Sequence, residues 1–206
     1  LDVLFEADHK NNADLGENTA REWIDQRGVD LIAGLNASPV AIAVTRLVEE
    51  KNRFAIVSTA AAASLTNEYC TPNHIHYVYD TYSVSNGAAK AIVAKGGDSW
   101  YLLSADYAFG HAMEEQVSKA VAASGGTVVG KARHPFQSSD FSSYILQAQA
   151  SGAKIIGLAS AGSDLVNAIS SANQFGLMEG GQTIASLMVF ITDIKAIGLP
   201  TAQGMS

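Results

Sequence analysis

The stretch IIGLASAGSDLVNAI (155–169) shows the unit from which this chain is built: an apolar run, a turn of small residues, then a segment with helical spacing. The same order occurs in LIAGLNASPVAIAV (31–44), AIVSTAAAASLT (55–66) and YLLSADYAFGHAM (101–113). Short apolar runs between amphipathic segments are typical of parallel strands covered by helices on both faces. The sequence therefore predicts an α/β fold with doubly wound parallel sheets and right-handed crossovers.

The same pattern extends along the whole chain. Strands are expected at about 2–6, 29–33, 54–57, 75–79, 99–103, 127–133, 154–158 and 184–190, and helices at about 12–27, 39–51, 84–95, 108–124, 140–151 and 163–175. In Ser38-Pro39 a capping hydroxyl precedes a proline suited to the first helical position. YVYDTYSVSNG (77–87) passes from a strand through polar residues into a helix, which predicts a connection between two α/β lobes.

Composition narrows the class of protein. The chain has 206 residues, of which 48% are hydrophobic, and a net charge of −7 without any run of Lys or Arg. Binding to a phosphate backbone needs clustered positive charge, so a nucleic-acid partner is not expected. The apolar runs are strand-sized, which predicts no membrane-spanning helix. The first residues read as a strand already under way and the last lack a closing helix, so both ends look cut.

Sequence motifs of enzymes are missing. Gly34 lacks the further glycines of a dinucleotide fingerprint, Gly125-Gly126 and Gly130 do not open a helix, and no Gly-Lys-Ser/Thr follows a strand. Ser163 lacks the flanking glycines of a nucleophile elbow. An enzyme is therefore less favoured than a binding protein, and no cofactor is implied.

Several polar residues have a structural and a functional interpretation. His74 and His76 share one face of a strand, where a packed pair is favoured over a metal site. His9 beside Asp8 is read as a solvated turn, and Asp106 as a helix cap. Cys70 is either a buried small hydrophobe or half of a disulfide whose partner lies outside this sequence.

The turns at the ends of the predicted strands form the strongest candidate site. Hydroxyls and free N–H groups at helix starts can hold an anion, and small side chains let it approach the backbone. Aromatic rings can cover the apolar part of the ligand. The candidate residues are Asn36, Ala37 and Ser38, then Thr59, Ala60 and Ala61, then Tyr107 and Phe109, then Ser160, Ala161 and Gly162. The predicted ligand is a small carboxylate.

At these residues the sequence resembles the type I periplasmic solute-binding proteins of branched-chain amino acid ABC transporters, the Leu/Ile/Val-binding kind. The matching stretches are GVDLIAGLNASPVAIAVTRLVEEKNRFAIVSTAAAASLT, DYAFG (106–110) and HPFQSSDFSSYILQAQASGAKIIGLASAGSDLVNAISSANQFGL. The likeness covers nearly all of the chain.

This resemblance implies two Rossmann-like lobes joined by a hinge, with the ligand in the cleft between them. Residues 1–80 would be a partial amino-terminal lobe lacking its first strand, 81–83 a hinge crossing, 84–202 the second lobe and 203–206 the start of a return crossing. The family's ligand turns map onto Asn36–Ser38, Ala60-Ala61 and Ser160–Gly162, and its aromatic cover onto Tyr107–Phe109. The resemblance implies a periplasmic, monomeric protein that delivers its ligand to a membrane permease.

One departure from the family bears on the ligand. Amino-acid binders of this family place an acid near the end of the next second-lobe strand, where this chain has Met188, Val189 and Phe190. A buried ammonium without a carboxylate is costly. An aromatic or other apolar acid without an amine is therefore favoured, although Asp193 lies close by. Branched-chain amino acids, and a ligand-sensing receptor or regulator of the same fold, remain alternatives.

Overall fold

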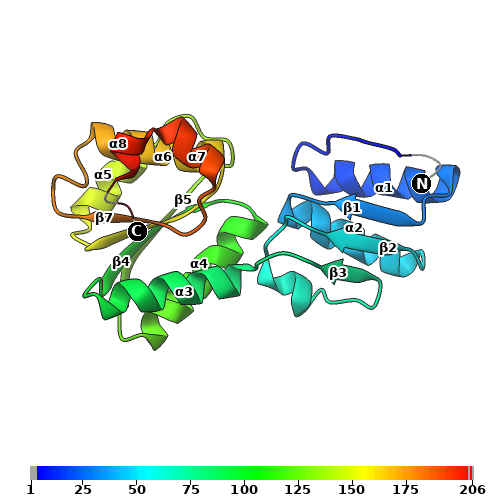
Figure 1. Cartoon of the computed structure of the whole chain (residues 1–206), viewed down its shortest axis with the longest axis horizontal. Helices are drawn as coiled ribbons and strands as arrows, with labels where there is room; N and C mark the ends of the chain where they lie inside the picture. Colours follow the sequence, from blue (N-terminus) through cyan, green and yellow to red (C-terminus); the bar gives the residue numbers. More distant parts are fainter. Residues whose placement is uncertain (1–3, 204, 206) are drawn as a thin grey trace. The chain divides into compact units, whose positions relative to one another are not determined.

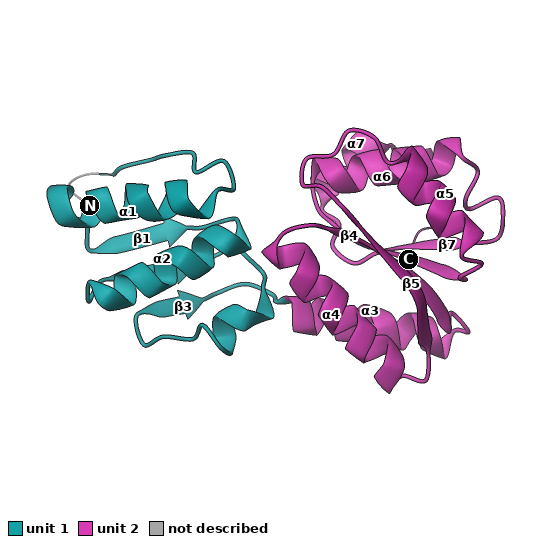
Figure 2. Cartoon of the chain, turned by 180° about the vertical axis from the view of Figure 1, so that it is seen from behind, with its two compact units in different colours: residues 1–80 teal, residues 81–206 magenta. Residues whose placement is uncertain are grey.

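The computed structural model describes residues 4–203 and 205. The chain forms two compact units, unit 1 from Leu1 to Asp80 and unit 2 from Thr81 to Ser206 (Figure 2). Each unit has its own parallel sheet. The α/β class with parallel sheets, predicted from the sequence, is confirmed.

Unit 1 contains a three-stranded sheet in the order β1-β2-β3, with all described neighbours parallel (Figure 1). Its elements are α1 (Ala13–Arg27), β1 (Leu31–Gly34), α2 (Ser38–Glu50), β2 (Phe54–Val57), the 3-10 helix η1 (Ala63–Thr66) and β3 (His74–His76). Because the strands are parallel, the turns after β1 and β2 lie at the same edge of the sheet.

The periodicity of α2 explains how unit 1 is packed. Val40, Val44 and Leu47 recur at helical spacing and are buried in one cluster with Ile32 of β1 and Val57 of β2. Burying side chains of this size contributes roughly 1.5–3 kcal/mol each. The helix is therefore held firmly, and its first turn is fixed at the carboxyl end of β1.

Unit 2 contains a four-stranded parallel sheet in the order β5-β4-β6-β7. Its helices cover both faces, α3 and α4 on one and α5, α6 and α7 on the other (Figure 1). The elements are α3 (Thr81–Ala94), β4 (Ser99–Ala105), α4 (Ala108–Ala123), β5 (Thr127–His134), α5 (Ser142–Ala150), β6 (Ile155–Ala159), α6 (Ser163–Gln174), β7 (Thr183–Ser186), α7 (Ile191–Ile197) and α8 (Leu199–Ala202).

The central strand β4 is buried on both faces, as its continuous apolar sequence predicts. Tyr101 and Leu103 belong to the cluster formed with α5 and α6. Trp100 and Leu102 alternate with them and are fully buried. The strand therefore fixes the positions of the residues that follow Ala105.

Two expected strands need correction, and the expected hinge and return crossings stay predictions. Residues 4–6 form no strand, and residues 2–3 of the predicted strand lie outside the described residues. Residues 81–83, expected as a crossing, form the first turn of α3, and their role as a hinge stays a prediction. The predicted strand 184–190 ends at Ser186, and α7 and α8 follow it. Of the expected return crossing at 203–206, residue 203 is a turn, and 204 and 206 lie outside the described residues.

Candidate functional site

The two strand-end turns of unit 1 are joined by hydrogen bonds. The Ala60 amide donates to the carbonyl oxygen of Leu35 (3.2 Å), and the Ala62 amide donates to Ser38 Oγ (3.2 Å). Ser38, Ala60 and Ala62 are all at least 98% buried. The structure therefore brings the predicted turn of Asn36, Ala37 and Ser38 together with that of Ala60 and Ala61.

Ser38 does not cap α2, contrary to the prediction. Ala37 is the N-cap, Ser38 is the first helical residue and Pro39 the second. Because Ser38 Oγ accepts the Ala62 N–H through an oxygen lone pair, its own O–H hydrogen remains a donor. The Ser38 hydroxyl is therefore not occupied in capping α2 and can donate its hydrogen to an anion.

The amino terminus of α2 is chemically suited to a negative charge. No side chain caps this helix, and no acidic residue lies in its first turn. The first N–H groups of a helix have no partner within the helix, and the helix dipole adds a partial positive charge there. Asn36 lies beside them and is exposed. This arrangement can hold a carboxylate.

The sequence predicted a helix after the second turn of unit 1, but no α-helix follows that turn. The four-residue 3-10 helix η1 begins at Ala63 instead. His76 Nε2 lies 2.7 Å from the carbonyl oxygen of Ala60, and His74 Nε2 lies 3.0 Å from that of Leu65. The histidine pair therefore holds this segment against β3, in agreement with the packed-pair interpretation.

In unit 2, Tyr107 lies at the carboxyl end of β4. It is the N-cap residue of α4, which has no side-chain cap and no acid in its first turn. Asp106, predicted as the cap, instead pairs with His111 (Nε2 to Oδ1, 2.7 Å). The Tyr107 ring is partly exposed, whereas Phe109 is 95% buried behind it, with ring centroids 5.8 Å apart. Tyr107 is thus the more exposed ring of the predicted pair, and Phe109 packs beside it.

The turn of Ser160, Ala161 and Gly162 connects β6 to α6. Gly162 has φ 61° and ψ −136°, a backbone conformation that side chains other than glycine rarely adopt. Ser160 Oγ is buried and has no hydrogen-bond partner among the described residues. Unlike α2, α6 has an acid in its first turn, Asp164. A carboxylate is therefore better placed at α2 than here.

Asp164 is a buried carboxyl that was not predicted from the sequence. Its Oδ2 accepts the Gln137 N–H (3.0 Å), while Oδ1 is buried without a partner among the described residues. Burial raises the pKa of Asp164, although the Gln137 N–H and the nearby His134 act in the opposite direction. Burial, and then the charge of Asp164, raise the pKa of Tyr107. These groups therefore lie close to one another at this edge of the sheet.

The segment after β7 does not supply an acid to this edge. The Oδ2 atom of Asp193 accepts the Phe190 N–H (2.9 Å) within the first turn of α7. Val189 and Phe190 are exposed, by 39% and 41%. The carboxylate of Asp193 is therefore engaged in capping α7.

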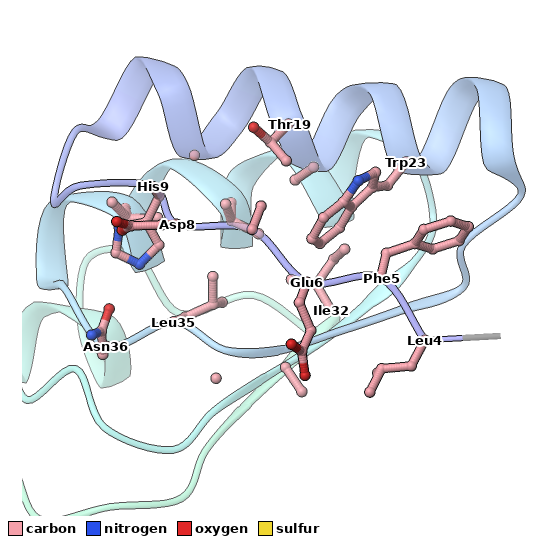
Figure 3. Close-up of a pocket in the computed structure, with 17 residues that line it drawn as sticks. Leu4, Phe5, Glu6, Asp8, His9, Thr19, Trp23, Ile32, Leu35 and Asn36 are labelled. Atoms are coloured by element: carbon pink, nitrogen blue, oxygen red, sulfur yellow. The ribbon is translucent and has the colours of Figure 1, made fainter. Parts of the chain in front are cut away.

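A cavity of about 880 Å³ in unit 1 lies along α1, between residues 4–9 and β1. Figure 3 shows Trp23 of α1 pointing toward the segment that carries Glu6. Asn36 is one of the lining residues, but the lining also includes the carboxylates of Glu6 and Asp8, and none of the described residues that line it is Lys or Arg. The cavity is therefore a poor site for a carboxylate.

The structure also shows the surroundings of Asp8, His9 and Cys70, the other polar residues considered from the sequence. Asp8 Oδ1 accepts the Lys10 N–H and His9 Nδ1 the Asn11 N–H, so both stabilise a turn. Cys70 is an exposed free thiol, which excludes the buried alternative. Within residues 4–203 and 205, no helix is both long enough and apolar enough to cross a bilayer.

Phe136 is a second residue at this edge that was not predicted from the sequence. It follows the end of β5, and its ring centroid lies 4.9 Å from that of Tyr107. The sequence feature that could have indicated Phe136 is its position shortly after the predicted strand 127–133, at the same sheet edge as Tyr107. Uncapped helix starts at the carboxyl ends of parallel strands, as seen in each unit, are typical of ligand-binding α/β proteins.

Comparison with known proteins identifies the class more closely. The chain belongs to the periplasmic binding protein family, whose model matches residues 3–206. This confirms the predicted resemblance to the Leu/Ile/Val-binding proteins of ABC transporters. The family consists of solute-binding proteins, which agrees with the predicted class of protein.

Three relatives illustrate the likeness. A periplasmic binding protein from Burkholderia mallei is 47% identical, with a TM-score of 0.93 over 97% of this chain and 53% of its own. A solute-binding protein of an ABC transporter from R. palustris, solved in complex with 4-hydroxybenzoate, is 28% identical, with a TM-score of 0.82 over 89% of this chain and 50% of its own. Leu/Ile/Val-binding protein homolog 6 of Brucella abortus (strain 2308) is 29% identical over 66% of this chain and 34% of its own length. The chain thus spans between a third and about half of these relatives.

Proposed function

We propose that this chain is part of an extracytoplasmic solute-binding protein of an ABC importer, and that it binds a small aromatic or other apolar carboxylate that has no amine. The amino terminus of α2 carries this proposal. It has free N–H groups, the Ser38 hydroxyl as a donor, and neither a capping side chain nor an acid in its first turn. The turn of Ala60 and Ala61 borders the same place.

The carboxylate is favoured there for electrostatic reasons. Hydrogen bonds to an ionised acceptor are roughly twice as strong as neutral ones. The helix dipole contributes a further 0.3–1 kcal/mol or so for a negative charge at this end. The nearby turns are lined by alanines, so a ligand can approach the backbone without a side chain in the way.

Unit 2 carries apolar groups that suit the proposed ligand. Tyr107 offers a partly exposed ring at the end of β4, next to Phe109. The small turn of Ser160, Ala161 and Gly162 leaves room for a bulky group. The R. palustris relative solved with 4-hydroxybenzoate supports an aromatic acid as the ligand.

The proposed role is binding and delivery without chemical change. A membrane permease would take up the ligand from the protein, which would work as a monomer outside the cytoplasm. The membership in a family of solute-binding proteins supports this role. Turnover of a bound acid would contradict it.

Calorimetry with benzoate, 4-hydroxybenzoate and leucine tests the ligand class. We expect binding of an aromatic acid, weakened about tenfold or more by Ser38→Ala, because the variant loses a donor and leaves the buried Ala62 N–H unpaired. Ser58→Ala is the matched control, since Ser58 is exposed and donates to the Gly34 carbonyl on the same turn (3.3 Å). Tight leucine binding without aromatic-acid binding would contradict the proposed ligand.

Amino-acid binding is the second candidate function. It is favoured by Asp164 Oδ1, which is buried without a partner among the described residues and could accept from an ammonium. The likeness to a Leu/Ile/Val-binding protein homolog points the same way. If this candidate is correct, Asp164→Asn lowers the affinity for leucine at least tenfold, whereas benzoate binding stays unchanged.

A further inference from the structure

The loop of residues 135–140, which follows β5, is fastened to α6. Asp164 Oδ2 accepts the Gln137 N–H (3.0 Å), and Asn167 Nδ2 donates to the Ser138 carbonyl oxygen (3.2 Å). Both side chains come from the first two turns of α6, the helix that begins directly after Gly162. The loop is thus connected to the predicted ligand turn of unit 2 through one rigid helix.

This attachment holds Phe136 against Tyr107. Their ring centroids are 4.9 Å apart and the ring planes are inclined by 52°. Both rings are partly exposed, while Phe109, whose ring centroid lies 5.8 Å from that of Tyr107, is buried. Tyr107 therefore contacts two other rings at centroid distances and tilts at which aromatic rings attract one another.

The two partly exposed rings lie at the same edge of the sheet. Ala105 of β4 pairs with His134 of β5 in the parallel ladder, and Tyr107 and Phe136 each follow two residues after these paired positions. The carboxyl end of a parallel sheet is where such folds bind ligands. Neither ring is needed to fill the core cluster of unit 2, which is formed by other side chains.

We propose that Phe136 is a specificity-determining residue, which with Tyr107 forms an aromatic surface that selects planar aromatic acids over aliphatic acids of the same size. The inference rests on the proposed function and adds a residue and a basis for selectivity to it. A flat ring can lie against either exposed ring at contact distance and gain the interaction between aromatic quadrupoles. A puckered aliphatic ring buries similar area but lacks that interaction.

Benzoate and cyclohexanecarboxylate form the test pair, because they share the carboxylate and nearly the same size. Affinities for both are measured by calorimetry on the wild-type chain and on Phe136→Leu, Phe136→Met and Phe136→Tyr. We expect the preference for benzoate to fall about fivefold in the Leu and Met variants and to be retained in the Tyr variant, which keeps the ring. Phe175→Leu, a partly exposed phenylalanine at the end of α6, is the matched control.

The outcomes separate the two proposals. Thermal melting without ligand identifies the variants that fold, and a lost preference in either folded variant supports the role of Phe136. A wild-type chain that binds the acids, with an unchanged preference in both Leu and Met variants, overturns that role alone. Affinities for the two acids that fall equally also overturn it. A wild-type chain that binds neither acid contradicts the proposed function itself.

Discussion

At the residue scale, Asp164 combines a structural bond with an unfavourable charge. Burial raises its pKa above the ordinary value of 3.8, so the folded chain binds its proton more tightly than the unfolded chain does. The destabilisation by the charged form is therefore absent at pH well below 3.8 and appears as the pH rises through the folded pKa. Asp164→Asn keeps an acceptor for the Gln137 N–H and removes the charge.

We therefore expect the stability of Asp164→Asn relative to wild type to increase as the pH rises from about 4 to about 7. Urea unfolding at both pH values measures this difference directly. A difference that stays constant, or that decreases with pH, would show that the carboxylate is not destabilised in the folded chain.

Glu114 on α4 differs from Asp164 because its pKa is lowered in the folded chain. Its burial favours the proton, but the fork of two hydrogen bonds from Arg133 (3.0 and 3.1 Å) and the charge of Lys131 outweigh burial and lower the pKa of Glu114. The resulting stabilisation is present above the ordinary value of 4.5 and disappears as the pH falls through the lower folded pKa.

Glu114→Gln should reduce the free energy of unfolding by about 1 kcal/mol at neutral pH, a modest loss because Arg133 is half exposed to solvent. The loss should shrink toward about pH 3. Glu115→Gln, one residue along the same helix, breaks an exposed pair with Lys119 and should change stability by less than about 0.5 kcal/mol. Equal losses in the two variants would contradict this assignment.

Local sequence predicted the positions of some candidate residues better than those of others. The small turns at 36–38 and 160–162 were predictable because they follow apolar runs and precede helical spacing. Asp164 and Phe136 were not, since their importance depends on a contact between α6 and a loop 27 residues earlier in the chain. Ser38 was found but given the wrong partner, because the Ala62 amide that it accepts from is distant in sequence.

At the scale of elements, the close approach of α4 to β4 depends on Gly110. A Cβ at this position would lie 2.0 Å from the Ala105 carbonyl oxygen, whereas a Cβ at Gly87, within α3, would meet no atom within 4 Å. Both glycines lie inside helices, so alanine improves the helix propensity of each by up to about 1 kcal/mol. Only the first substitution forces a helix away from its strand.

Gly110→Ala should therefore destabilise the chain by roughly 1–3 kcal/mol, and Gly87→Ala should stabilise it by about 0.5 kcal/mol or more. Thermal melting of the two variants beside wild type measures both effects. The displacement of α4 should also move Tyr107, its N-cap residue, and so weaken benzoate binding in Gly110→Ala but not in Gly87→Ala. Equal melting temperatures would show that β4 and α4 separate easily.

The order of strands and helices followed from periodicity, but some element ends did not. The run at 184–190 looks like one strand because Leu187, Met188, Val189 and Phe190 are all apolar, yet the chain turns into α7, where the Asp193 carboxylate accepts the Phe190 N–H. A capping bond of this kind involves backbone geometry that hydrophobic spacing does not encode.

At the scale of the whole molecule, each unit is a sheet with its own apolar cluster. A ligand that binds the folded chain raises its apparent stability by mass action, by about 2.7 kcal/mol at a hundred times the dissociation constant. We expect benzoate to raise the melting temperature of the wild-type chain and to do so less in Ser38→Ala. A melting temperature that does not respond to any carboxylate would contradict ligand binding by this chain.

Strand β1 has a further consequence for handling the protein. Among the described residues it pairs only with β2, and Leu31 on it is 47% exposed. The outer rim of such a strand is a template on which a second chain can extend the sheet, and exposed apolar residues there promote aggregation. Concentrated solutions should therefore scatter light increasingly with time, and Leu31→Lys, which places a charge on the rim, should delay that rise, whereas Leu146→Lys on the exposed side of α5 should not.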